Sequence, residues 1–135
     1  MTSREIYDVN RYSLDKEFIA SGKLTVIDEG QNTILFYKDS EIKEQASAMY
    51  HPKAALENLR KQLEAKHQSI IGINGCRMDT DYRFDGSFNS YVIELGIKAT
   101  ENLHMFEPTI EIEKLCTVAQ HEVAYDKWLE SVISK

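Results

Sequence analysis

Hydrophobic and polar positions divide the chain into a few distinct segments. Lys23–Asp28 (KLTVID) and Thr33–Lys38 (TILFYK) are rich in β-branched and aromatic residues, and Glu29–Asn32 between them is typical of a turn. This pattern predicts a β-hairpin. Residues 4–20 fit either a helix or short strands, because their apolar positions suit both spacings. Ser40–Met49 is polar with weak helical character, and we expect it to be a connection.

Two amphipathic helices are predicted. Pro52 opens the first, since proline is tolerated at the first helical position, and His67 and Gln68 end it. The second begins at Thr117–Gln120, where threonine and glutamine suit a capping box. Each helix has one apolar stripe. The stripes are Ala55, Leu56, Leu59 and Leu63 in the first helix, and Val118, Tyr125, Trp128, Leu129 and Val132 in the second.

Shorter apolar runs lie between and after these features. Ser69–Ile73 predicts a strand, and Tyr91–Leu95 predicts a second strand with one buried face. We expect a short turn of helix at Leu103–Phe106, which Pro108 stops, and a short strand at 110–113. Together the segments indicate an α+β fold in which two amphipathic helices pack a mainly antiparallel β-sheet.

Length and composition favour a single domain spanning residues 1–135. The chain is 42% hydrophobic and 28% charged, as in an ordinary globular protein, and its length suits one core. It has no signal-like N-terminus and no apolar run of about 20 residues, so we expect a cytoplasmic protein. Cys76 and Cys116 form no CxxC pair, and we expect them to be reduced and structural.

Charge changes the functional interpretation, because the net charge of −6 is localised. Residues 79–113 hold eight acids and only two bases, while the rest of the chain is balanced. Such a field repels nucleic acid and anionic membranes, and it attracts a basic partner. The alternative is a solvated face that only keeps the protein soluble.

The stretch Gly75–Tyr91 (GCRMDTDYRFDGSFNSY) mixes acids with aromatics between two apolar runs. Unpaired carboxylates are rarely buried, and disordered linkers carry few aromatics. An exposed loop that contacts a partner accounts for both, with aromatic anchors and steering carboxylates. The alternative is that Phe84 or Phe88 turns inward to close the core. The acids are Asp79, Asp81 and Asp85, and the aromatics are Tyr82, Phe84 and Phe88.

Metal chemistry is the main competing interpretation of this stretch. Asp79, Asp81 and Asp85 are spaced loosely like a calcium loop, but Arg83 stands at a ligand position. Two nearby carboxylates, Asp79 and Asp81, also suit a metal-dependent hydrolase or nuclease. The four histidines have no metal-ligand spacing, and nucleophile elbows and phosphate-binding loops are absent from the sequence. We therefore expect a binding protein without a metal or cofactor rather than an enzyme.

Five segments resemble a family of bacterial immunity proteins. They are LENLRKQLEAK (Leu56–Lys66), NGCRMD (Asn74–Asp79), SYVIELG (Ser90–Gly96), HMFEP (His104–Pro108) and CTVAQHEVAYDKWLESV (Cys116–Val132). Proteins of this family are similar to the small inhibitors that are encoded beside polymorphic toxins and that each neutralise the neighbouring toxin. These toxins include those delivered by contact or by secretion systems. The chain departs from the family after Arg77–Asp79, where DYRFDGSFN replaces a longer Pro-Ser-Gly-Met type tract.

The resemblance and the charge pattern together lead to one hypothesis. The chain is expected to bind a basic, nuclease-like toxin domain and to occlude its active site or substrate groove, acting as a monomer or weak dimer. A structural subunit of a larger complex is the third alternative. We expect Asp79, Asp81, Asp85 and Glu107 to steer and pair with the partner, Tyr82 and Phe88 to anchor it, Arg77 to fix the loop through a carboxylate, and Trp128 to be structural.

Overall fold

Four strands at the start of the chain form most of a five-stranded antiparallel sheet. The structure is a computed structural model, and it describes residues 2–82, 88–99 and 102–133. The strands follow the order β4-β3-β2-β1-β5 across the sheet, so the first four are consecutive meander neighbours. They are β1 (Ser3–Ser13), β2 (Phe18–Asp28), β3 (Asn32–Asp39), β4 (Lys43–Met49) and β5 (Ser69–Ile71).

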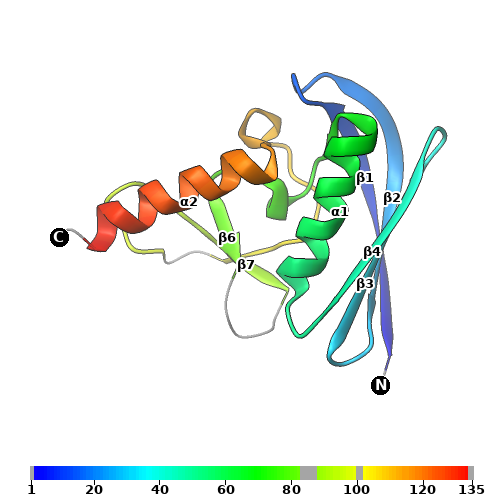
Figure 1. Cartoon of the computed structure of the whole chain (residues 1–135), viewed down its shortest axis with the longest axis horizontal. Helices are drawn as coiled ribbons and strands as arrows, with labels where there is room; N and C mark the ends of the chain where they lie inside the picture. The colour runs from blue at the N-terminus through cyan, green and yellow to red at the C-terminus, as the bar shows by residue number, and fades with distance from the viewer. Residues whose placement is uncertain (1, 83–87, 100–101, 134–135) are drawn as a thin grey trace.

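A smaller antiparallel sheet and two helices complete the α+β fold. Helix α1 (Pro52–His67) lies between the large sheet and the small one, and α2 (Val118–Ile133) lies across the small sheet (Figure 1). The small sheet has the order β6-β7-β8. The remaining elements are η1 (Asn74–Cys76), β6 (Thr80–Tyr82), β7 (Asn89–Val92), β8 (Asn102–His104) and η2 (Ile112–Lys114).

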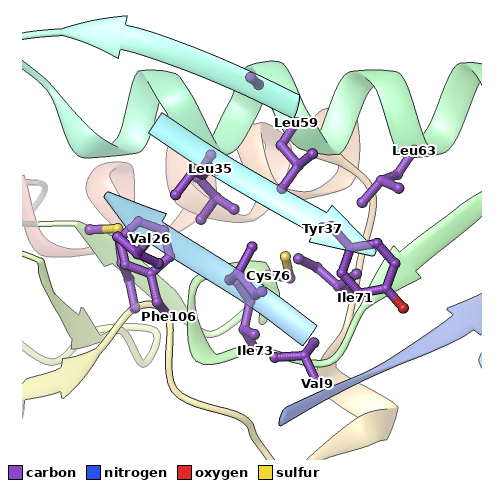
Figure 2. Close-up of a cluster of buried hydrophobic side chains, with 14 of the residues drawn as sticks. Val9, Val26, Leu35, Tyr37, Leu59, Leu63, Ile71, Ile73, Cys76 and Phe106 are labelled. Carbon is purple, nitrogen blue, oxygen red and sulfur yellow. The ribbon is translucent and has the colours of Figure 1, made fainter. Parts of the chain in front are cut away.

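The main core lies between α1 and the five-stranded sheet. Leu59 and Leu63 project from α1 toward Leu35 and Tyr37 of β3, and all four side chains are fully buried (Figure 2). Burial of each such side chain contributes about 1.5–3 kcal/mol relative to an exposed one. The helix ends at Gln68, whose backbone adopts the left-handed conformation at φ 48°. The predicted apolar stripe of α1 is therefore the side that packs against the five-stranded sheet.

Close packing joins α1 to the second half of the chain at Gly75. A Cβ atom added there would lie 2.6 Å from Leu56 Cδ2 and 3.0 Å from the carbonyl oxygen of Met105. Only glycine permits the backbone of η1 to approach the helix this closely. This contact brings the start of the stretch predicted to be an exposed loop into the interior.

Several predicted elements are confirmed. The hairpin at Lys23–Lys38 is formed by β2 and β3, and both helices begin where the sequence indicates. Thr117 and Gln120 form the expected capping box: each backbone N–H donates to the other residue's side chain, at 3.0 and 3.2 Å. The predicted strand at Ser69–Ile73 is β5. The strand predicted at Tyr91–Leu95 is only partly correct, because β7 spans Asn89–Val92 and Leu95, expected on the buried face, is 67% exposed.

The ambiguous start of the chain is a strand, and Ser40–Met49 is wrongly predicted as a connection. β4 pairs with β3 along its whole length, and its Ala46 turns inward under α1. Polar residues alternate with small ones in β4, so its strand conformation depends on its neighbours rather than on its own propensity.

Two short predictions near the second helix are also wrong. Leu103–Phe106 was expected to be helical, but Leu103 lies in β8 and pairs with Ser90 of β7. Residues 110–113 were expected to form a strand, but Ile112 begins the 3₁₀ turn η2. In the described parts of the chain, no helix is long and apolar enough to cross a membrane.

Candidate functional site

The predicted contact loop begins with a partly buried ion pair. Arg77 donates from Nε and Nη2 to the two carboxylate oxygens of Asp79, at 2.8 and 2.7 Å, and Lys114 Nζ lies 3.2 Å from the same carboxylate. Burial alone raises the pKa of Asp79, but these hydrogen bonds and cations outweigh it and lower the pKa. Arg77 therefore fixes this segment through a carboxylate, as expected. Two cations already hold Asp79, and its side chain is only 22% exposed.

Asp81 is inside the protein rather than on an exposed loop. It is only 3% exposed, it lies 3.2 Å from Lys53 Nζ of α1, and it accepts a hydrogen bond from the Tyr91 hydroxyl at 3.3 Å. Its β6 backbone pairs with β7, which turns the side chain toward α1. The expectation that Asp81 lies on an exposed loop is wrong, because its side chain is buried and already paired with Lys53.

The other predicted contact residues have different environments. Phe88 is half-buried and packs edge-on against Phe106 and His104, with ring centroids 5.2 and 6.0 Å apart, so it takes the inward alternative rather than that of an exposed anchor. Glu107 is exposed. Asp85 and the Tyr82 side chain lie outside the described residues. Trp128 is 8% exposed and donates from Nε1 to the Ile97 carbonyl at 2.9 Å, which agrees with its expected structural role.

Asp79 and Asp81 are not brought together as a metal pair. Asp79 lines an apolar pocket under Trp128, whereas Asp81 lines a polar pocket between the helices. Each carboxylate is already neutralised by lysine or arginine, which occupies the place that a metal ion would need. Cys76 and Cys116 are free and buried, and burial raises the pKa of the Cys76 thiol to about 12, so it stays protonated.

The polar pocket is the strongest candidate site. It has a volume of about 220 Å³ and opens between α1 and α2. Four carboxylates line it, and Lys53 is the single lysine or arginine among the described lining residues. A tyrosine ring forms part of the wall, with Lys53 Nζ 6.0 Å from its centroid. The lining residues are Lys53, Glu57, Asp81, His121, Glu122, Tyr125 and Asp126.

His121 does not offset this negative charge at neutral pH. Arg60 Nη1 lies 2.9 Å from His121 Nδ1, and because a guanidinium only donates, Nδ1 is the acceptor. The Nε2–H then donates to the Thr80 carbonyl. Burial and the Arg60 charge lower the pKa of His121 to about 4. The histidine is therefore neutral, and it joins α2 to both α1 and β6.

Sequence reasoning missed most of this pocket. Glu122 and Asp126 lie outside the acidic region at 79–113, and neither was singled out. The sequence did contain a signal, because Glu122 and Asp126 are like charges four residues apart on a helix. Such a pair destabilises the helix, so its presence needs an explanation. Glu57 and Lys53 lie some seventy residues away from them in the sequence, so only the packing of α1 against α2 reveals the cluster.

A second surface feature adjoins the other side of α2. One pocket of about 280 Å³ is lined mainly by apolar side chains, including Met78, Leu95 and Trp128. A neighbouring pocket of about 350 Å³ shares Met78 and adds Val123 of α2. Met78, Leu95 and Val123 are 41%, 67% and 54% exposed, so they offer apolar area at the surface. Thus α2 separates an acidic pocket from an apolar one.

Comparison with protein-family models, with curated proteins and with solved structures found no match to the chain. The chemistry of the α1–α2 pocket and the segments that resemble immunity proteins are therefore the features that bear on function. The pocket combines excess carboxylate with an aromatic wall, which are the features that recognise lysine or arginine side chains.

Proposed function

We propose that the chain is an immunity protein that binds and neutralises a basic toxin domain, with the α1–α2 pocket receiving a lysine or arginine side chain of the toxin. The single observation that supports this most is the excess of carboxylates among the pocket's described lining residues, four against one lysine. Lys53 is already paired with Asp81 and Glu57, at 3.2 and 3.7 Å. His121 is neutral, so Glu122 and Asp126 keep their negative field.

The pocket suits a long cationic side chain better than a small anion or an apolar group. Glu122 and Asp126 are exposed at its mouth, where they would meet an incoming positive charge first. Lys53 Nζ already lies over the Tyr125 ring, 6.0 Å from its centroid, so this wall of the pocket accommodates a cation. Arginine would form charge-assisted hydrogen bonds with the carboxylates, which are roughly twice as strong as neutral hydrogen bonds.

Inhibition would follow from occlusion. Toxin domains that act on nucleic acid need basic residues to hold the phosphate backbone, and pairing those residues with carboxylates removes them from the substrate. Apolar side chains beyond α2, such as Met78 and Val123, would add buried area next to the charged contact. Exposed Glu107 keeps its predicted steering role in this proposal. The proposal also places the protein in the cytoplasm, where such toxins act.

The test uses the product of the gene immediately upstream, which the proposal expects to carry the toxin domain. Association is measured by stopped-flow fluorescence, and toxin activity is measured with and without the protein. The variant Glu122→Lys/Asp126→Lys should slow association at least tenfold at low salt, with a smaller effect at high salt. The matched control is Asp15→Lys/Glu29→Lys, which makes the same charge change at exposed sites on the five-stranded sheet.

The outcomes separate the parts of the proposal. Absence of inhibition by the wild-type protein would overturn the immunity function. Equal effects of the pocket and control variants would show that net charge alone matters, and would reject the pocket as the contact site. A complex that never dissociates and leaves toxin activity intact would support the structural-subunit alternative instead.

A further inference from the structure

One edge of the five-stranded sheet is open along half a strand. β1 pairs with β2 from Ser3 to Tyr12, but on its other side it pairs with β5 only at Arg11–Ser13. The last contact on that side is the Gly72 N–H, which donates to the Asn10 carbonyl at 2.9 Å. Residues 3–8 beyond it are mostly exposed. This free end of β1 leads to the N-terminus, on the opposite side of the molecule from the C-terminal end of α2 (Figure 1).

The alternation of residues along β1 determines which backbone groups point toward the open edge. The Asn10 carbonyl faces the β5 side, and alternate residues of a strand direct their N–H and C=O groups to the same side. Arg4, Ile6 and Asp8 therefore present backbone donors and acceptors along the open edge. Within the described residues, none of these groups has a hydrogen-bond partner on that side. Such an edge is a template for pairing with another strand.

We propose that the open edge of β1 pairs with β1 of a second copy of this chain, antiparallel and about a two-fold axis at Ile6. In this register Ile6 lies opposite Ile6 of the second copy, and Arg4 lies opposite Asp8. Each of the three outward-facing residues exchanges two backbone hydrogen bonds with the residue opposite it. The two five-stranded sheets then continue into one another across the axis.

Charge and existing contacts select this register over its neighbours. An axis at Glu5 would place two Glu5 carboxylates opposite one another. An axis at Tyr7 would place Arg4 opposite Asn10, whose carbonyl already accepts the Gly72 N–H. An axis at Asp8 would place two Asp8 carboxylates opposite one another and would collide with β5. An axis at Arg4 would place two guanidinium groups together. Like charges directly opposite one another are destabilising, whereas opposite charges stabilise a strand pair. The axis at Ile6 gives two Arg4–Asp8 pairs around a central apolar contact, and it covers a side chain that is 55% exposed.

The contact that Asp8 already makes within its own chain competes only weakly with the proposed strand pairing. Asp8 already pairs with Lys23 at 2.5 Å, but both side chains are highly exposed, at 86% and 65%, and exposed pairs contribute little. The opposite edge of the sheet differs, because α1 packs against β4 and Asn58 donates to the Ser47 carbonyl at 3.2 Å. This pairing surface is separate from the α1–α2 pocket, so it goes beyond the proposed toxin binding.

Charge reversal tests the register directly. Sedimentation equilibrium over a wide range of protein concentration should give a mass approaching twice the chain mass of 15.6 kDa. Arg4→Asp alone and Asp8→Arg alone each create two like-charge pairs, and each should weaken dimerisation at least tenfold. The double variant Arg4→Asp/Asp8→Arg restores opposite charges and should recover dimerisation. Lys43→Asp on β4 is the matched control and should have no effect.

Hydrogen exchange supplies a second readout that specifies strand pairing. The backbone amides of Arg4, Ile6 and Asp8 should become protected as protein concentration rises, while the exchange of amides in β4 stays constant. A chain that remains monomeric at high concentration would overturn the proposal. So would a dimer that is unaffected by the single charge reversals, because its interface would lie elsewhere. Binding of an extended segment from a different protein to a monomeric chain would assign the edge to that partner.

Discussion

At the scale of single residues, Asp39 is the most heavily bonded side chain of the large sheet. Arg11 Nε donates to its Oδ2 at 2.7 Å, and the Tyr37 hydroxyl donates to the same oxygen at 2.8 Å. Its Oδ1 accepts the backbone N–H groups of Glu41 and Ile42. Burial alone raises the pKa of Asp39, but these donors outweigh it and lower the pKa to about 2.

Replacing this carboxylate should destabilise the fold strongly. Asp39→Asn removes the buried carboxylate partner of Arg11, which is only 4% exposed, and leaves it only the exposed Glu41 carboxylate at 3.6 Å. Breaking a buried pair costs about 3–5 kcal/mol. Urea unfolding followed by circular dichroism measures the loss. Asp15→Asn makes the same chemical change at an exposed position in the turn between β1 and β2 and should cost under about 0.5 kcal/mol. Equal losses in the two variants would contradict this account.

His121 makes stability depend on pH in a defined window. Its pKa is about 4 in the folded protein and 6.5 for the ordinary side chain, so the unfolded chain binds a proton that the folded one does not. Its contribution is fully present above pH 6.5 and falls as pH drops toward 4. From pH 7 to pH 5 the free energy of unfolding should decrease by about 2 kcal/mol from this group.

The measurement compares urea unfolding at the two pH values. His121→Gln should be less stable at pH 7 but should lose less stability on going to pH 5. Exposed His51 is the control, and His51→Gln should keep the wild-type pH dependence. If His121→Gln kept the full decrease, another group would be responsible for it.

At the scale of elements, the start of α2 depends on side chains of its own and of α1. The capping box joins Thr117 to Gln120, and Glu64 of α1 accepts the Val118 N–H at 3.1 Å. Thr117→Ala removes the acceptor for the Gln120 N–H and should cost about 1 kcal/mol. Thermal unfolding measures this loss. Thr117→Ser keeps the hydroxyl and should lie close to wild type, and a loss as large as that of the alanine variant would argue against capping.

Elements with local signals were predictable from the sequence, and the others were not. Pro52, the leucine stripe and the capping box act within a few residues, so both helices were located correctly. β4 has no such signal: its polar sequence becomes a strand because β3 and α1 lie beside it. β8 is likewise defined by its partner β7, and three residues are too few for a periodic pattern.

The same distinction explains the candidate site. Arg77 was expected to fix the loop through a carboxylate, and that carboxylate is Asp79, two residues away, which was itself expected to pair with the partner. Asp81 was misplaced because its partner, Lys53, lies on a helix twenty-eight positions earlier. An acid in a polar stretch suggests exposure when its partner is unknown. The pocket of Glu57, Glu122 and Asp126 needs the arrangement of two helices, which no local pattern specifies.

At the scale of the whole molecule, one question is whether the two sheets unfold together. Arg60 of α1 is a buried polar link between the helix that packs on the large sheet and the second half of the chain, since it is only 5% exposed. Its guanidinium donates to the carbonyl oxygens of Cys116 and Gly75, at 2.9 and 3.4 Å, and to His121. Leu56 and Met105 pack on either side of Gly75 and supply apolar contact across the same boundary. This continuity favours a single cooperative unit.

Trp128, the single tryptophan, lies in α2, so its fluorescence follows unfolding of the second half of the chain. Most of the circular dichroism signal arises from the large sheet and the helices together. Comparing the two signals therefore tests whether the chain unfolds as one unit. Wild-type unfolding curves from the two signals should coincide. Arg60→Leu leaves buried carbonyls unpaired, which costs about 1–3 kcal/mol each, and the fluorescence transition should move to lower urea than the circular dichroism transition. Lys61→Leu, at the exposed neighbouring position of α1, should leave the two curves together. Coincident curves in Arg60→Leu would show that apolar contacts around Gly75 suffice to couple the sheets.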